Sequence, residues 1–173
     1  LGPSGIGINS YTNSIVQYFV LFGSIGVGLY GNRQIAFVRD NQVKMSKVFY
    51  EIFILRLLTI CLAYLLFVAF LTINGQYHEY YLFQSIAIVA AAFDISWFFM
   101  GIENFKVTVL RNFIVQLLAL FSIFLFVKSY NDLNIYILIT VLSTLIGNLT
   151  FFPSLHRYLV KVNYRELRPI KHL

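Results

Sequence analysis

Five long apolar runs constrain what this chain can fold into. They cover about residues 10–30, 48–73, 80–101, 107–127 and 133–152, and a helix needs about 20 apolar residues to cross a bilayer. Hydrophobic residues make up 59% of the sequence and charged residues only 12%, against roughly 25% charged residues in soluble domains. The chain is therefore expected to be an all-α polytopic membrane protein with five transmembrane helices.

The basic residues are distributed unevenly between the two ends of these spans. Four Lys or Arg lie in segment 32–47, which reads as a loop, two in 106–111 and five in a tail over 153–173, whereas the opposite loops hold only Lys128. Cytoplasmic loops of membrane proteins carry an excess of Lys and Arg. The pattern predicts that the basic segments are cytoplasmic and that the amino end is outside. It also explains the net charge of +6 without nucleic-acid binding.

The third run contains an acid, Asp94, within an otherwise apolar stretch. In an unbroken helix, Trp97 and Gly101 would share its face. An ionisable group inside a membrane is costly and tends to mark a functional site with a partner. At about 1.5 Å per residue, Asp94 lies roughly 10 Å from the basic end of its span, a depth that Arg56 and Arg111 also reach. We expect Asp94 to pair with one of these arginines.

Two interpretations of such a pair remain open. The pair can serve only to lock helix packing, or the excess positive charge beside it can attract an anionic ligand, since guanidinium groups bind phosphate oxygens in pairs. Arg56 can alternatively extend along its alkyl stem to the membrane interface. Asn13, in the first span, is expected to face protein or a cavity rather than lipid.

Shorter patterns are interpreted structurally. Gly26-Val-Gly-Leu-Tyr-Gly31 fits a dinucleotide fingerprint, but it ends a membrane helix and is better explained by close helix packing or a bend. Asn148-Leu-Thr150 matches a glycosylation sequon but falls inside a span. Cys61 is expected to behave as a small buried apolar side chain. Two ion pairs are expected at helix ends, Lys47 with Glu51 and Glu103 with Lys106.

Several stretches together resemble a known family. They are Leu1-Gly-Pro-Ser-Gly-Ile-Gly7, Gly28-Leu-Tyr-Gly-Asn-Arg33 with Arg39-Asp40, and Asp94-Ile-Ser-Trp-Phe-Phe-Met-Gly-Ile-Glu103. They are similar to the Wzx-type flippases of bacterial O-antigen and capsule synthesis, within the multidrug/oligosaccharidyl-lipid/polysaccharide exporter superfamily. The last stretch is the most specific, and the likeness covers nearly the whole chain.

The resemblance implies a carrier of twelve to fourteen spans in two six-helix lobes, located in the bacterial inner membrane. Such carriers flip undecaprenyl-diphosphate-linked oligosaccharide repeat units across the bilayer. The chain would supply helices two to six of the first lobe, and the rest of its own polypeptide would be a partner; the sequence begins without Met or a signal peptide. Cationic cavity residues are typical of the family. The candidate cavity residues are Asn13, Arg33, Arg56, Asp94, Trp97, Glu103 and Arg111.

Neither a cofactor, a metal nor a catalytic residue is expected, although proton or sodium coupling is compatible with the resemblance. Two alternatives remain. A cation-coupled drug exporter of the same superfamily would need an acidic, aromatic cavity. A membrane-embedded enzyme acting on polyprenyl-phosphate sugars, with Asp94 or Glu103 as base, would need clustered acids and histidines, whereas His78, His156 and His172 are scattered along the sequence.

Overall fold

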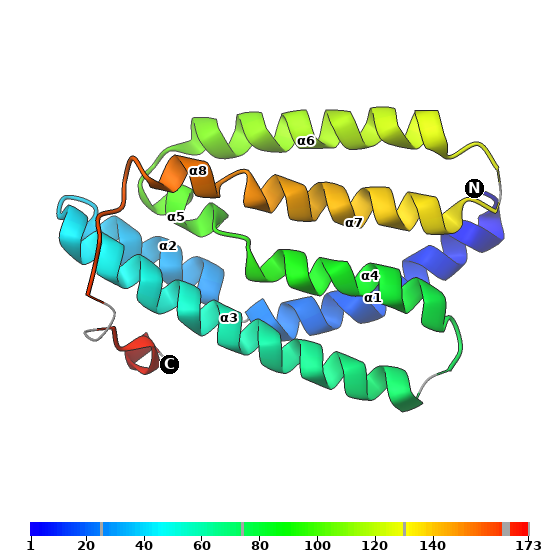
Figure 1. The fold of residues 1–173 in the computed structure, drawn as a ribbon, viewed down its shortest axis with the longest axis horizontal. Helices are drawn as coiled ribbons and strands as arrows, with labels where there is room; N and C mark the ends of the chain where they lie inside the picture. The colour runs from blue at the N-terminus through cyan, green and yellow to red at the C-terminus, as the bar shows by residue number, and fades with distance from the viewer. Residues whose placement is uncertain (25, 74, 130, 164–166, 173) are drawn as a thin grey trace.

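A computed structural model describes residues 1–173 apart from positions 25, 74, 130, 164–166 and 173. All regular secondary structure in the described residues is helical. The long helices lie side by side, and the chain reverses direction from each membrane-length segment to the next (Figure 1). They are α1 (Pro3–Ser24), α2 (Val27–Val38), α3 (Gln42–Ile73), α4 (His78–Ala92), α5 (Ser96–Gly101), α6 (Phe105–Phe126), α7 (Leu133–Leu149), α8 (Phe152–Leu155) and the 3-10 helix η2 (Pro169–His172).

Five segments of the described chain are long and apolar enough to cross a membrane. The predicted fold class, an all-α polytopic membrane protein with five spans, is confirmed. Three of the segments contain an interruption, because α1 and α2, α4 and α5, and α7 and α8 each form one span. The segments are Pro3–Val38, Gln42–Ile73, His78–Gly101, Phe105–Phe126 and Leu133–Leu155.

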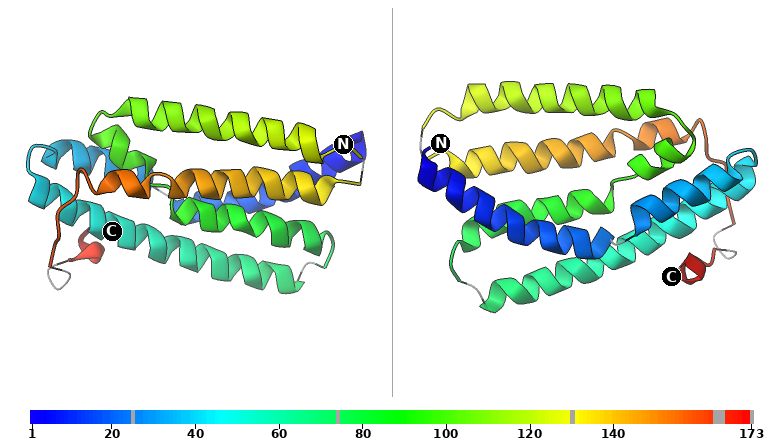
Figure 2. Two further views of the ribbon diagram at one scale, coloured as in Figure 1. Left: turned by 45° about the horizontal axis from the view of Figure 1, so that its top comes forward. Right: turned by 180° about the vertical axis from the view of Figure 1, so that it is seen from behind.

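Helix α4 lies at the centre of the bundle, where it packs against α1, α3 and α7. Helix α6 lies at one edge and packs mainly against α7 and α5 (Figure 2). Thr108 is its one buried residue. Most of α6 therefore presents apolar side chains outward, as a helix exposed to lipid or to another protein surface does.

One end of the bundle brings together the α2–α3 turn, the α5–α6 turn and α8 (Figure 1). We call it the basic end, because Arg39 is in the α2–α3 turn, Lys106 is in the first turn of α6 and Arg157 follows α8. The α3–α4 and α6–α7 turns lie at the other end, with Lys128. The charge asymmetry that the sequence predicted thus corresponds to two opposite ends of the fold.

A cluster of aromatic rings fills the core near the basic end. Phe49 of α3 and Trp97 of α5 lie 5.6 Å apart between ring centroids, within the range in which aromatic pairs stabilise a core. Gly31 of α2 packs directly on the indole, since a Cβ at this glycine would lie 2.6 Å from Trp97 Cε3. Of the glycines in the motif, Gly31 thus permits close helix packing, whereas Gly26 lies before α2 with a φ of 71° and a Cβ at Gly28 would meet nothing within 4 Å. The cluster comprises Phe49, Trp97, Phe98, Phe99 and Phe151.

The first and second spans are more helical than the sequence suggested. The first span was expected to begin at about residue 10, but α1 begins at Pro3, a residue whose fixed φ favours the first helical turn. Of the expected loop over 32–47, only residues 39–41 lie outside α2 and α3. Asn41 explains the early start of α3, because its Oδ1 accepts the Lys44 N–H at 3.0 Å in the manner of a helix cap.

The third span is broken rather than continuous. Helix α4 ends at Ala92 and α5 begins at Ser96, which leaves Asp94 in the non-helical connection. The expectation that Asp94, Trp97 and Gly101 share one face of a single helix is therefore wrong. The carboxylate oxygen Oδ1 of Asp94 accepts the Ser96 N–H at 3.1 Å, a local bond that competes with helix propagation.

The tail after α8 packs against α3 and does not extend away from the bundle. The carboxylate of Glu51, which is buried in α3, accepts the Arg168 N–H at 2.8 Å and contacts His172 Nε2 at 2.8 Å. The Nδ1 of the same ring lies 2.8 Å from the Tyr30 hydroxyl oxygen. Glu51 thus fixes η2 against α3 rather than pairing with Lys47 as expected. Arg165 of the basic tail lies outside the described residues.

Two smaller expectations are also corrected. Cys61 is exposed on the surface of α3 rather than buried. Glu103 pairs with Arg39 across the α2–α3 and α5–α6 turns, at 2.5 Å, rather than with Lys106. Both partners of this pair are substantially exposed, so the bond is expected to contribute little to stability.

Candidate substrate cavity

A polar cavity of about 650 Å³ lies among α1, α4, α6 and α7. Arg56 of α3 and Asp94 of the α4–α5 break line it, together with Arg111 of α6. We call it the polar cavity. Its other polar lining residues are Asn13, Gln17, Ser24, Ser96, Asn112, Thr140, Thr144 and Asn148.

Arg56 occupies the break between α4 and α5. Its Nε donates to the Ala91 carbonyl oxygen at 2.7 Å, and its Nη2 lies 3.4 Å from Asp94 Oδ2. The Arg56 side chain is 5% exposed, whereas that of Asp94 is 35% exposed. One guanidinium therefore binds both a backbone acceptor and the acid, and the acid remains accessible from the cavity.

The break leaves carbonyl groups at the end of α4 without their usual helical donors. Besides the bond from Arg56 to Ala91, Asn148 Nδ2 donates to the Ala90 carbonyl oxygen at 2.7 Å. Non-helical backbone at membrane depth is tolerated where it is buried in protein or lines a cavity and its polar groups are satisfied. Two side chains from other spans thus stabilise the broken helix.

Arg111 approaches the cavity from α6. Its Nη1 donates to the Gly147 carbonyl oxygen and lies 3.3 Å from Asn148 Oδ1, while its Nη2 donates to Asn112 Oδ1. The guanidinium carbon lies 3.8 Å from the centre of the Phe151 ring, a cation–π geometry. These contacts position the arginine beside α7.

Two buried polar atoms beside the cavity lack a partner in the part of the chain that the structure describes. They are Arg111 Nε and Ser24 Oγ. Buried polar groups are nearly always hydrogen-bonded, so such atoms indicate a water or a ligand. The lining also carries two guanidinium groups against one carboxylate. The charges of the lining therefore suit an anionic ligand.

The structure brings four of the seven candidate residues together. Asn13, Arg56, Asp94 and Arg111 all line the polar cavity, and the expected pairing of Asp94 is with Arg56. Their role toward a ligand stays a prediction. The other three do not line it: Trp97 is in the aromatic core, Glu103 pairs with Arg39, and Arg33 is exposed on α2.

The sequence reasoning missed most of the α7 wall. Thr140, Thr144 and Asn148 lie four residues apart and line the cavity together, as side chains at i, i+4 and i+8 share one helix face. The spacing is present in the sequence, but one polar residue per turn of an otherwise apolar run does not by itself indicate a cavity. Asn112 also lines the cavity and was not among the candidate residues.

Over residues 1–172 the chain matches the family model described as "Polysaccharide biosynthesis protein". The chain belongs to this family. The resemblance drawn from the sequence motifs is therefore supported over nearly the entire length of the chain. As a polysaccharide biosynthesis protein with five spans, it is a multi-pass membrane protein.

Two curated relatives agree with this assignment. A "Putative O-antigen transporter" of Escherichia coli (strain K12) is 22% identical over 138 residues, which cover 78% of this chain and 33% of the relative. A "Putative O-antigen transporter" of Shigella dysenteriae is 33% identical over 122 residues, covering 68% of this chain and 30% of the relative. The chain thus spans about a third of each. No solved structure matches this polysaccharide biosynthesis protein.

Proposed function

We propose that the chain is part of a carrier that moves undecaprenyl-diphosphate-linked oligosaccharide repeat units across the bacterial cytoplasmic membrane for surface polysaccharide synthesis. The observation that carries this proposal is the polar cavity, with two arginines against one acid, in a member of a polysaccharide biosynthesis family. The names of both relatives describe transporters. The proposed activity moves a molecule without making or breaking covalent bonds.

The chemistry of the lining suits such a substrate. A diphosphate is anionic, and the guanidinium groups of Arg56 and Arg111 can bind its oxygens through charge-assisted hydrogen bonds. Amide and hydroxyl groups, such as those of Asn13 and Thr140, can donate to and accept from sugar hydroxyls. The same positive balance disfavours a cationic drug as the ligand, so the polysaccharide carrier is preferred over the drug exporter.

The charge distribution suggests the direction of loading. If the basic end is cytoplasmic, as the excess of Lys and Arg predicts, the polar cavity lies nearer the inner leaflet, because Asp94 is near that end of its span. The carrier would bind its substrate from this leaflet and release it on the other side by alternating access, as repeat-built carriers with broken helices do.

Deletion of the complete gene in its host, followed by complementation, tests this function. Loss of surface polysaccharide with accumulation of undecaprenyl-linked repeat units inside the cell is the expected result. Wild type and Arg33→Ala should restore export, since Arg33 lies outside the cavity, whereas Arg111→Ala should not. Normal surface polysaccharide in the deletion strain, without a second carrier gene, would contradict the proposal.

A further inference from the structure

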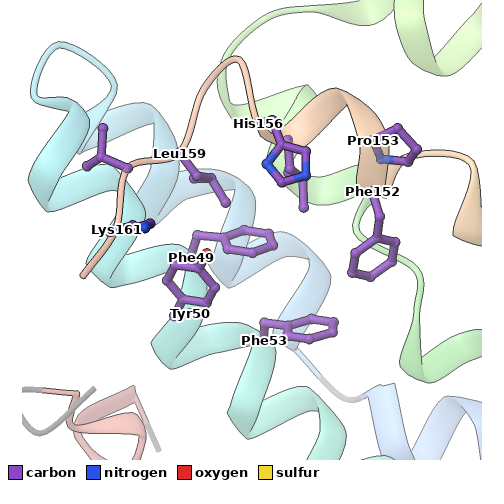
Figure 3. A pocket seen from close by; sticks show the side chains of 10 residues that line it. Phe49, Tyr50, Phe53, Phe152, Pro153, His156, Leu159 and Lys161 are labelled. Atoms are coloured by element: carbon purple, nitrogen blue, oxygen red, sulfur yellow. The ribbon is translucent and has the colours of Figure 1, made fainter. Parts of the chain in front are cut away.

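A second cavity, of about 610 Å³, lies between α3 and the segment that follows α7. Phe49 and Phe53 of α3 line it on one side, and Phe152 of α8 lines it on the other (Figure 3). The rings of Phe53 and Phe152 meet edge-on, with 5.8 Å between their centroids. The volume falls within the range of about 300–1,000 Å³ that small ligands occupy. We call it the interfacial cavity; it shares no lining residue with the polar cavity.

The lining of the interfacial cavity has two chemically distinct parts. Aromatic and aliphatic side chains, including Phe53, Phe152 and Leu159, form most of it. His156 and Lys161 add an imidazole and an ammonium group, and both side chains are exposed (Figure 3). Among the residues that the structure describes, no acidic side chain lines this cavity. The complementary ligand is therefore an amphiphile with an apolar chain and a negative head.

The position of the cavity along the span indicates which amphiphile. Phe49 and Phe53 belong to the apolar segment Gln42–Ile73, whereas His156 follows the last residue of the segment Leu133–Leu155 directly. The apolar part thus lies at the depth of lipid chains, and the basic part lies where lipid phosphates begin. Basic pockets at this level of a membrane protein bind anionic lipid head groups, and aromatic residues favour the same interface.

We propose that the interfacial cavity binds an anionic glycerophospholipid of the surrounding membrane. The lipid phosphate contacts Lys161 and His156, and the first part of an acyl chain lies against Phe53 and Phe152. The site depends on the fold alone and not on the proposed transport function, so its failure would leave that function untouched.

The only tryptophan in the sequence provides a local probe. Trp97 contacts Phe49 at 5.6 Å between ring centroids, and Phe49 lines the interfacial cavity. The chain is reconstituted in nanodiscs of phosphatidylcholine with a fixed fraction of phosphatidylglycerol. Either lipid carries brominated acyl chains, which quench tryptophan fluorescence on close approach. We expect brominated phosphatidylglycerol to quench Trp97 at least twofold more than brominated phosphatidylcholine at the same fraction.

Matched variants separate a built site from general attraction to a basic protein. Lys161→Gln and His156→Gln should each reduce the preference for phosphatidylglycerol. Lys44→Gln, which removes one exposed charge from the same end of the bundle, should leave it unchanged. All three positions are exposed, and circular dichroism checks that each variant retains its helices.

Three results would overturn the proposal. Equal quenching by the two brominated lipids would show that the cavity does not select an anionic lipid, as would be found if another protein segment covered it. An equal loss of preference in Lys44→Gln would assign the effect to net charge. An unchanged preference in both Lys161→Gln and His156→Gln would show that these two side chains do not bind the lipid head group.

Discussion

Arg56 Nη2 lies 3.4 Å from Asp94 Oδ2 at the point where the third span is broken. The Nε of the same arginine donates to the Ala91 carbonyl oxygen at 2.7 Å. The arginine therefore acts as a cap for α4 and as the partner of an intramembrane acid. Its position links the stability of the broken helix to the charge of the polar cavity.

Removing this cap should destabilise the fold. Arg56→Ala removes the charge-assisted hydrogen bond of 2.7 Å to the Ala91 carbonyl oxygen, which keeps the Asp94 N–H as a donor at 3.3 Å. A hydrogen bond from a charged group contributes about 1.5–3 kcal/mol. Loss of the Asp94 contact should add less, because that side chain is partly exposed. Unfolding in mixed dodecyl maltoside and dodecyl sulfate micelles measures the free energy. Arg33→Ala is the control, and equal stability of the two variants would refute the capping role.

Close packing of α2 against α5 can be tested at two glycines of one helix. Gly31→Ala places a Cβ 2.6 Å from Trp97 Cε3, whereas Gly28→Ala meets nothing within 4 Å. Overpacking of a core costs about 1–3 kcal/mol, so Gly31→Ala should lower the free energy of unfolding by that amount. Gly28→Ala should not lower it. If both variants behaved alike, the contact between Gly31 and the indole would not determine packing.

The buried carboxylate of Glu51 should control how the tail docks. Glu51→Ala removes the acceptor for the Arg168 N–H and the partner of His172. We expect amide hydrogen exchange over 167–172 to become faster, at least tenfold, while exchange in α4 is unchanged. Glu103→Ala removes an exposed carboxylate at the same end of the bundle and should not affect the tail. Unchanged exchange in Glu51→Ala would mean that other contacts hold η2.

The α6–α7 turn should respond to acid. Asp132 Oδ2 accepts the N–H groups of Ser129 at 2.7 Å and Lys128 at 2.9 Å, and these bonds lower the pKa of the carboxyl below its ordinary value of 3.8. Because the folded-state pKa is the lower one, the stabilisation is complete above the unfolded value. It is lost as the pH falls through the folded-state pKa.

Protection of the Lys128 and Ser129 amides from hydrogen exchange, corrected for the intrinsic rate, should therefore be constant above about pH 4 and decrease at lower pH. Asp132→Asn keeps an acceptor that does not titrate, so its protection should not change over this interval. A decrease of the same size in Asp132→Asn would assign the acid response to another group.

The number of spans could be predicted from the sequence because a bilayer sets a minimum length for an apolar helix. The break at Asp94 could not, since most residues around it are apolar and the side-chain donors to the carbonyls at the end of α4 come from distant positions. Arg56 is 35 residues from Ala91, and Asn148 is 58 residues from Ala90. Patterns over a few neighbouring residues do not predict contacts between such distant positions.

The cost of a polar group in an apolar run explains which cavity residues could be predicted from the sequence. Asn13, Arg56, Asp94 and Arg111 were selected because polar groups are costly in an apolar run, and all four line one cavity. Trp97 was expected on the same helix face as Asp94, but the break places it in the aromatic core. Glu103 was a candidate from the stretch Asp94–Glu103 that resembles the family, but it pairs with Arg39 outside the cavity. The docking of His172 on Glu51 joins residues 121 positions apart, a contact that only the tertiary fold specifies.

The most direct test of the central claim is photo-crosslinking to the lipid-linked substrate in membranes of the host. A benzoylphenylalanine at Thr140 lies in the polar cavity, and one at Leu118 lies on the exposed surface of α6. We expect radiolabelled undecaprenyl-diphosphate oligosaccharide to crosslink at position 140. Arg111→Gln should reduce this signal at least fivefold, and Arg33→Gln should not reduce it. Crosslinking confined to position 118, or a position-140 signal that persists in Arg111→Gln, would contradict the proposed function.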